Sequence, residues 1–315
     1  MRRVTPVVAA AALFSVTSVS AQDLGGVHEP GLFDGPSYSP YAGRNFPDKP
    51  LWGDSHLHTT LSFDAGAFGN RLGPEEAYQF ARGEEVTSTG GYKVRLARPL
   101  DWLVVADHSD NMGLFTMIFD SDPAILADSE GRRIHDMIKA GGQTAVAASV
   151  ELIDTFSRGE EISEALSVEP GDKSFTSTWE RIVKAAEDYN DPGRFTAFIG
   201  YEWTSLVNSG DNLHRVVIYR DGADVALRPE PYTTMAPFGS PDPVELWKWL
   251  DGVEEASGGD VLAIAHNGNL SNGIMFPVTR QFTGRRIDDD YVNARAKWEP
   301  LYEVTQIKGD GETHP

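Results

Sequence analysis

The stretch Leu51-Trp52-Gly53-Asp54-Ser55-His56-Leu57-His58 places two imidazoles one residue apart at the end of a short apolar approach. On an extended backbone alternate side chains project to the same face, so His56 and His58 can chelate one metal ion. Asp54 shares that face, where it could ligate the metal or orient an imidazole. Asp64 follows in a polar turn and could reach the same centre. The segment therefore predicts a strand that delivers metal ligands.

The same theme returns along the chain, with apolar runs that end abruptly in polar residues. These ends are Asp107-His108 after residues 102 to 106, Glu202 after residues 195 to 201, and His266-Asn267 after residues 261 to 265. Buried strands expel unpaired polar groups, so such ends indicate a site. A carboxylate at Glu202 could bridge two metals. His214 differs because it precedes its apolar run, and barrel geometry alone leaves it out of the cluster.

Short apolar runs that alternate with polar, helix-compatible stretches predict an α/β domain with a mostly parallel sheet. Six strands are expected, near residues 51–57, 102–107, 195–201, 214–219, 261–265 and 301–306. Helices are expected at residues 74–82 and 241–256, within 121–157, and within 175–189. The long region between the second and third strands, residues 109–194, is interpreted as an inserted helical layer.

The N-terminus has the three parts of a secretory signal peptide, with a basic start, a short apolar core and a Val19-Ser20-Ala21 ending. We therefore expect residues 1–21 to be removed and the protein to be periplasmic or secreted. Residues 22–50 are rich in Gly, Pro, Ser and Tyr and predict an extended arm. Residues 51–315 form the expected catalytic domain. No later segment is apolar enough to predict a membrane span.

The composition limits both the chemistry and the partners. The sequence has no cysteine, so any metal must be held by nitrogen and oxygen ligands. Without Arg2 and Arg3, 25 of the 27 basic residues remain against 47 acidic ones, a net charge of −22 with histidine neutral. That charge argues against nucleic acid or an anionic membrane as partner. We expect a small anionic substrate, held by locally concentrated positive charge such as bound metal. No protein partner is evident.

The order of these motifs resembles the PHP (polymerase and histidinol phosphatase) superfamily, and in detail its secreted branch called domain of unknown function 3604. The matching segments are Gly53 to Thr59, Ala106-Asp107-His108, Gly200-Tyr201-Glu202, Leu213 to Val217, and Ala265-His266. The resemblance implies a distorted seven-stranded β/α barrel with up to three metals at the carboxyl ends of its strands. It implies as ligands His56, His58, Asp64, His108, Glu202, His214 and His266, and so restores His214.

One motif of the superfamily has no counterpart here. Its last motif, Asp-x-His at the end of a late strand, is missing before the sequence stops at Pro315. We therefore expect the barrel to be incomplete at its C-terminus and this sequence to be an N-terminal fragment of a longer chain.

A cluster of histidines with bridging carboxylates and no thiolate suits two or three ions of Zn, Mn or Fe. Such ions generate hydroxide at neutral pH and clamp both oxygens of an in-line displacement. We therefore expect hydrolysis of an anionic ester, first a phosphoester, with no protein nucleophile beyond the metal-bound hydroxide. Side chains expected to orient ligands or contact substrate are Asp54, Asp107, Trp203, Arg215, Asn267 and Asn269.

Two other readings of the sequence stay open. An amidohydrolase-type barrel also opens with HxH and would cleave C–N or ester bonds, but that scheme uses a metal-bridging lysine, and no strand-end lysine occurs before Lys308. A secreted, non-catalytic binding module with a degenerate metal site is the alternative of a different class.

Overall fold

The computed structural model describes residues 49–311 except 161 and 307. The expected signal peptide and nearly all of the expected arm lie outside the described residues. From Leu51 onward the chain forms one compact unit. None of the helices in the described part combines the length and the apolar character that a membrane span requires.

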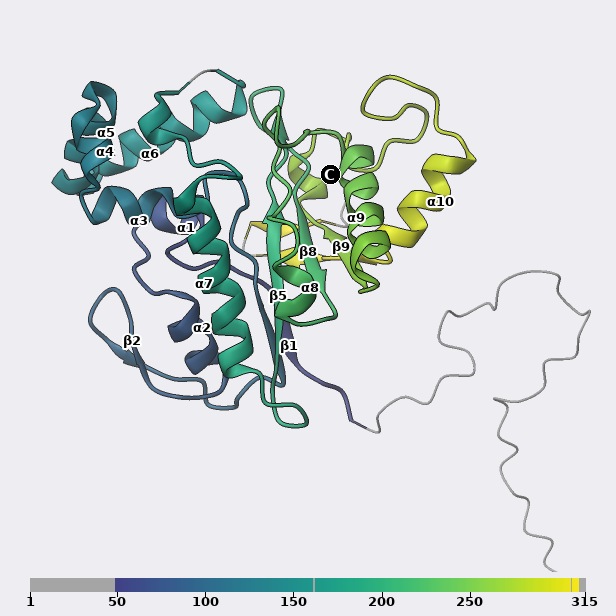
Figure 1. Ribbon diagram of the computed structural model, residues 1–315, viewed down its shortest axis with the longest axis horizontal. Coiled ribbons are helices and arrows are strands. Elements are labelled where there is room, and N and C mark those ends of the chain that lie inside the picture. The colour runs from purple at the N-terminus through teal and green to yellow at the C-terminus, as the bar shows by residue number, and fades with distance from the viewer. Residues whose placement is uncertain (1–48, 161, 307, 312–315) are drawn as a thin grey trace, which may run out of the picture. The chain divides into compact units, whose positions relative to one another are not determined.

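A six-stranded sheet lies at the centre of this unit (Figure 1). Its order is β1 (Gly53–Leu57), β4 (Trp102–Val105), β5 (Thr196–Trp203), β8 (Arg215–Tyr219), β9 (Val261–Ala265) and β10 (Leu301–Tyr302). All six predicted strands are present. The prediction of one strand over residues 301–306 is wrong in extent, because β11 (Thr305–Gln306) leaves the sheet and pairs with β12 (Gly309–Asp310).

Five strands of the sheet run in one direction and β8 runs in the other. β1, β4 and β5 are parallel, β9 and β10 are parallel, and β8 is antiparallel to both of its neighbours. The connection from Trp203 to Arg215 is too short for a crossover helix; it contains only the hairpin of β6 (Leu206–Val207) and β7 (Asp211–Asn212). The beginning of β8 therefore lies beside the carboxyl ends of the other strands.

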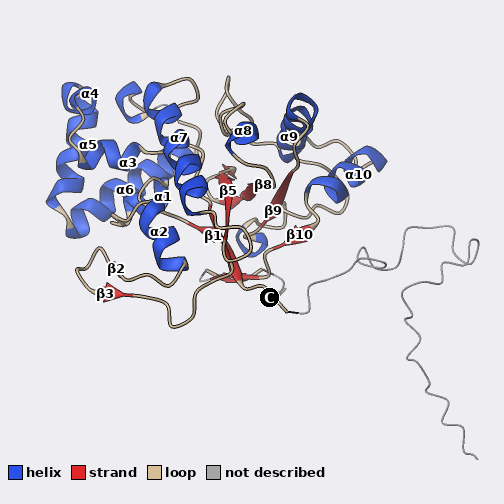
Figure 2. Ribbon diagram, turned by 60° about the horizontal axis from the view of Figure 1, so that its bottom comes forward, coloured by secondary structure: helices blue, strands red, loops and turns tan. Residues whose placement is uncertain are grey.

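Ten α-helices are present in the described part of the chain (Figure 2). They are α1 (Phe63–Ala67), α2 (Pro74–Ala81), α3 (Leu114–Phe119), α4 (Pro123–Ala127), α5 (Ser129–Ala140), α6 (Gly142–Ser157), α7 (Lys173–Tyr189), α8 (Ala223–Ala226), α9 (Pro243–Ser257) and α10 (Asp289–Trp298). Helices α3 to α7 form the expected insertion between β4 and β5. The hairpin of β2 (Val86–Thr87) and β3 (Lys93–Val94) follows α2.

Apolar side chains pack on both faces of the sheet, which explains the unbroken apolar runs of its strands. Leu103 and Val105 pack in the large core shared with the helices. Val104 and Ala106 alternate with them and join Val216 and Ile264 in a second, smaller cluster. Gly200 of β5 lies so close to Val104 and Val217 that a Cβ there would be 2.6 Å from a side-chain carbon and 2.7 Å from a backbone oxygen.

The sheet is curled into a half-barrel, so its two edge strands approach each other. His56 belongs to β1 at one edge, and Glu303 directly follows β10 at the other. Their side chains are nevertheless 2.7 Å apart, from Nδ1 to Oε2. The described residues thus form an α/β half-barrel of six strands, where the resemblance implied a seven-stranded barrel.

Candidate metal centre

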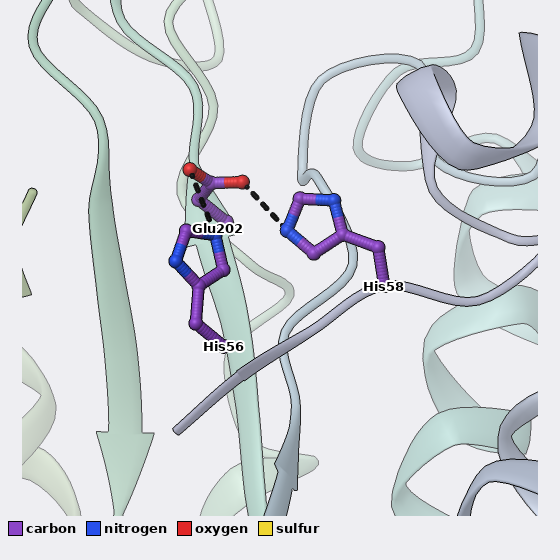
Figure 3. Close-up of side chains that lie close together, drawn as sticks. All are labelled: His56, His58 and Glu202. Carbon is purple, nitrogen blue, oxygen red and sulfur yellow. Dashed lines mark ion pairs between the residues drawn. The ribbon is translucent and has the colours of Figure 1, made fainter. Parts of the chain in front are cut away.

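Glu202, at the carboxyl end of β5, is the centre of a cluster of five imidazoles. Its side chain is fully buried. Oε2 lies 3.0 Å from both His58 Nε2 and His108 Nδ1, while Oε1 lies 3.5 Å from His56 Nε2, 2.9 Å from His214 Nδ1 and in contact with His266 Nε2. Figure 3 shows His56 and His58 meeting opposite oxygens of this carboxylate. One carboxylate thus joins imidazoles from four other segments of the chain.

Two further carboxylates extend the cluster in different directions. Asp64 lies in α1, with Oδ1 2.8 Å from His58 Nδ1 and Oδ2 3.6 Å from His108 Nε2. Glu303 lies 2.7 Å from His56 Nδ1 and 4.0 Å from His266 Nδ1. Four of the five histidines therefore lie between a central and a peripheral carboxylate, an arrangement that suits more than one cation.

Four overlapping groups of three side chains could each hold a metal ion. Within each group, the ligand atoms lie within 4.8 Å of one another. The groups are His56-His58-Glu202, His56-His266-Glu303, His58-Asp64-His108 and His108-Glu202-His214. Because Glu202, His56, His58 and His108 each belong to two groups, neighbouring ions would share ligands.

Hydroxyl groups and a buried carboxylate fix the backbone around the ligands. Ser62 donates its hydroxyl to Asp64 Oδ1 at 2.7 Å and accepts the His108 backbone N–H at 3.2 Å. Asp107 is fully buried and accepts both the backbone N–H and the hydroxyl of Thr59, which follows His58. Burial nevertheless raises the Asp107 pKa to about 6. Asp107 thus ties the loop after β1 to the end of β4.

The cluster divides its histidines into two electrostatic classes. Burial lowers the pKa of His58, but Asp64 and Glu202 outweigh it and raise that pKa to about 9. Neighbouring carboxylates likewise outweigh burial at two other histidines, raising the pKa of His56 to about 9 and that of His108 to about 10. At His214 and His266 burial prevails, and the pKa falls to about 3 and about 4. Burial of Glu202 raises its pKa, but the surrounding imidazoles outweigh this effect and hold the Glu202 pKa well below its usual range.

The residues fit a metal centre with nitrogen and oxygen ligands. When His214 Nδ1 donates to Glu202, its Nε2 carries the lone pair, and among the described residues this buried atom has no hydrogen-bond partner. An imidazole held by a carboxylate through one nitrogen and free at the other is the usual arrangement of a metal-ligating histidine. Glu202 Oε2 is likewise buried without a hydrogen bond in the described part.

A family model described as a protein of unknown function, DUF3604, matches residues 45–315. The chain belongs to this family. No curated protein and no solved structure matched the chain.

In this DUF3604 chain all seven side chains implied as ligands meet in one cluster. They are His56, His58, Asp64, His108, Glu202, His214 and His266. His214 belongs to the cluster although barrel geometry with a parallel strand at residues 214–219 predicted the opposite, and that prediction is wrong. Since β8 is antiparallel, a residue that precedes it reaches the same edge as residues that follow the other strands.

The side chains expected to orient ligands or contact substrate are more dispersed. Asp54 is exposed and accepts the backbone N–H of His56 at 2.8 Å, so it braces the strand rather than an imidazole. Asp107 acts through Thr59, as described above. Asn269 is exposed. Asn267 is buried at a φ of 63°, and its amide has no hydrogen-bond partner within the described residues.

Trp203 and Arg215 belong to the interior of this DUF3604 domain. Trp203 is fully buried, and the Arg215 guanidinium lies 5.8 Å from its ring centre. Arg215 is 1% exposed and donates to Glu299 at 2.9 Å. Its guanidinium is thus engaged in a buried ion pair, and neither a substrate contact nor a surface salt bridge describes it.

Glu303 belongs to the cluster but was not predicted from the sequence. The predicted strand over residues 301–306 would have contained Glu303, whereas β10 ends at Tyr302, one residue before Glu303. The signal was the same as elsewhere, a carboxylate after an apolar pair, but Leu301-Tyr302 is too short a run to stand out.

Proposed function

We propose that this protein is a metal-dependent hydrolase that cleaves phosphoesters with two or three divalent ions. The observation that carries the proposal is the fully buried Glu202 carboxylate in contact with five imidazoles, with Asp64 and Glu303 at the periphery. Such a concentration of buried ionisable groups is costly unless cations balance it. Perturbed pKa values of this kind also concentrate at functional sites.

The donor set favours Zn, Mn or Fe, because imidazole suits Zn and Fe while the added carboxylates suit Mn and Fe. When bound, such ions lower the pKa of water, polarise an ester oxygen and clamp the attacking and leaving oxygens of an in-line displacement. The chain's own part is to present neutral imidazoles and to fix their orientation. Glu202, Asp64 and Glu303 do so by accepting hydrogen bonds from the histidine nitrogens that do not ligate.

Substrate has access to one side of the cluster. The Asp64 side chain is 38% exposed, whereas those of Glu202 and His266 are fully buried. The buried amide of Asn267, which directly follows His266, has no hydrogen-bond partner among the described residues and is therefore available to a ligand. Positive charge supplied by metals would let a strongly acidic chain hold an anionic ester.

We further propose that this DUF3604 domain is a divergent PHP-type barrel and that the protein is exported. Ligands from successive strand ends, including one before a reversed strand, support the first proposal. The basic, apolar and small-residue segments at the N-terminus support the second. Mass spectrometry of protein recovered from the periplasm or medium would test export, with a mature N-terminus near residue 22 as the expected result.

Metal analysis and hydrolysis assays together test the enzymatic proposal. Purified protein loaded with Zn, Mn or Fe should carry two or three ions and hydrolyse members of a phosphoester, sulfate-ester and carboxyl-ester panel, phosphoesters best. His58→Ala and His108→Ala should each lose metal and activity, while His135→Ala, which alters a histidine outside the cluster, should lose neither. Full metal loading without hydrolysis of any panel member would favour the binding-module hypothesis. If amides are assayed beside the esters, their preferred cleavage would favour the amidohydrolase hypothesis.

A further inference from the structure

A cavity of about 280 Å³ opens beside the metal cluster. Three cluster side chains, Asp64, His108 and His214, contribute to its wall. Four apolar side chains also line it, Phe63, Ile153, Phe156 and Leu206, together with the polar residues Asp110, Asn111, Thr204 and Asn212. The cavity therefore combines the edge of the cluster, where metal ions would hold an anionic group, with hydrocarbon surface.

The apolar wall is built by elements outside the sheet. Ile153 and Phe156 lie three residues apart on α6, so they face the same side of that helix. Phe63 begins α1, and its ring centre is 6.5 Å from that of Phe156. Leu206 belongs to β6. All four side chains are only partly buried, so hydrocarbon surface is left open directly beside a polar centre.

The size of the cavity limits what it can hold. An apolar cavity of about 150 Å³ accommodates benzene, so a cavity of about 280 Å³ has room for one substituted aromatic ring but not for a large polycyclic group. Among the described residues that line it, Lys308 is the one lysine or arginine, and it is exposed. Its ammonium group offers a positive charge for an anion that metal ions at Asp64, His108 and His214 would hold.

We propose that the substrate is a monoester of an apolar, aryl-sized alcohol, whose ring occupies the cavity lined by Phe63, Ile153, Phe156 and Leu206. This proposal rests on the proposed phosphoesterase function and specifies its substrate class. In the reaction the oxygen of water bonds to phosphorus and the phosphorus–oxygen bond to the aryl group breaks. The aryl oxygen leaves with the proton given up by water, so the products are a phenol and inorganic phosphate.

Binding of two phosphonates that differ only in the apolar group tests this. Phenylphosphonate and methylphosphonate are titrated calorimetrically into the full chain loaded with Zn or Mn. Phenylphosphonate should bind at least about ten-fold more tightly, because its ring buries apolar surface. Phe156→Ala should remove most of that advantage and leave methylphosphonate affinity within about two-fold. Phe238→Ala, at an exposed phenylalanine outside the cavity, should change neither affinity.

Ile153→Ala tests the same wall if the Phe156 variant does not fold, and it should also lower the affinity for phenylphosphonate alone. Equal affinity of the wild type for both phosphonates would overturn the substrate class, as would an aryl preference that survives both variants. Hydrolysis assays with phenyl phosphate and methyl phosphate distinguish failure of the proposed substrate class from failure of the proposed function. Hydrolysis of both with no aryl preference contradicts only the substrate class; binding of phosphonates without hydrolysis of either ester contradicts the function itself.

Discussion

His56 and Glu303 lie at opposite edges of the sheet in pairing order, yet their side chains are 2.7 Å apart. Gln306 adds a second contact from the same segment, with its Nε2 3.2 Å from His56 Nδ1. The edges of the half-barrel are thus joined by polar side chains at the candidate metal centre rather than by backbone pairing. If metal binds there, occupancy of the cluster and closure of the sheet edges are coupled.

Removal of the Glu303 charge should therefore weaken metal binding without unfolding the chain. Glu303→Gln keeps the size of a side chain that is 19% exposed but removes its charge. Loss of such a supporting carboxylate lowers metal affinity about 10–100-fold, and calorimetric titration with Zn would measure it. Glu245→Gln, on the exposed face of α9, should bind metal like the wild type. Unchanged affinity of Glu303→Gln would show that Glu303 does not support the centre.

The metal-free protein should lose stability as pH rises above neutrality. His56 and His58 have pKa values of about 9, and His108 of about 10, all above the ordinary 6.5. A raised histidine pKa contributes stability that is fully present below about pH 6.5 and disappears as pH rises through the folded pKa. Thermal unfolding of EDTA-treated protein should thus show a lower midpoint at pH 9.5 than at pH 6.5.

Bound metal should reverse this loss of stability with rising pH, because ligating imidazoles are neutral and metal binding competes with protons. Zn affinity should therefore rise with pH up to about 9 to 10. His135→Gln should retain the loss of stability in the metal-free protein, since His135 lies outside the cluster and contacts Ser121 and Asp136. A flat stability profile from pH 6.5 to 9.5 without metal would contradict the assigned charges.

The sequence predicts the parts of this domain that depend on local pattern. The unbroken apolar run of β4 and the Pro243 start of α9, where Asp242 accepts the Val244 N–H at 2.9 Å, follow from burial and capping. The cluster around Glu202 could be predicted because strand ends meet at one edge. Strand direction could not be predicted from the sequence, and only the pairing of β8 with β5 and β9 shows why His214 belongs to the cluster.

Residues whose partners are distant in sequence were the hardest to predict. Arg215 follows a ligand, which suggested an anion contact, but its partner Glu299 is 84 residues away. Glu303 reaches His56 across 247 residues, through a curl of the sheet that no local pattern encodes. Both errors concern polar side chains, whose roles depend on what tertiary packing brings to them.

Arg215 should be required for stability rather than for catalysis. Its ion pair with Glu299 is buried, and Glu299 also accepts the Trp247 Nε1–H at 2.9 Å. Arg215→Met leaves the buried Glu299 carboxylate with Arg295, at 3.0 Å, as its remaining cationic partner. The loss of one partner should reduce the free energy of unfolding by about 2–3 kcal/mol, measured by urea denaturation. Arg220→Met, at an exposed ion pair, should cost about 1 kcal/mol or less. A similarly small loss at Arg215 would contradict the structural assignment.

The hydroxyl of Thr59 should stabilise the protein more above pH 6 than below it. Thr59 is 1% exposed and donates its hydroxyl to Asp107 Oδ2 at 2.6 Å. Thr59→Val keeps the shape but leaves a buried carboxylate short of one donor, a cost of about 1–3 kcal/mol. Because burial already raises the Asp107 pKa to about 6, loss of a donor to the ionised form raises it further. The raised pKa means that ionisation opposes folding, so the penalty should be larger at pH 8 than at pH 5. Urea unfolding at both pH values measures this penalty, with Thr155→Val, at a partly exposed helical threonine, as the control. An equal penalty at pH 5 and pH 8 would show that Thr59 does not stabilise the ionised carboxylate.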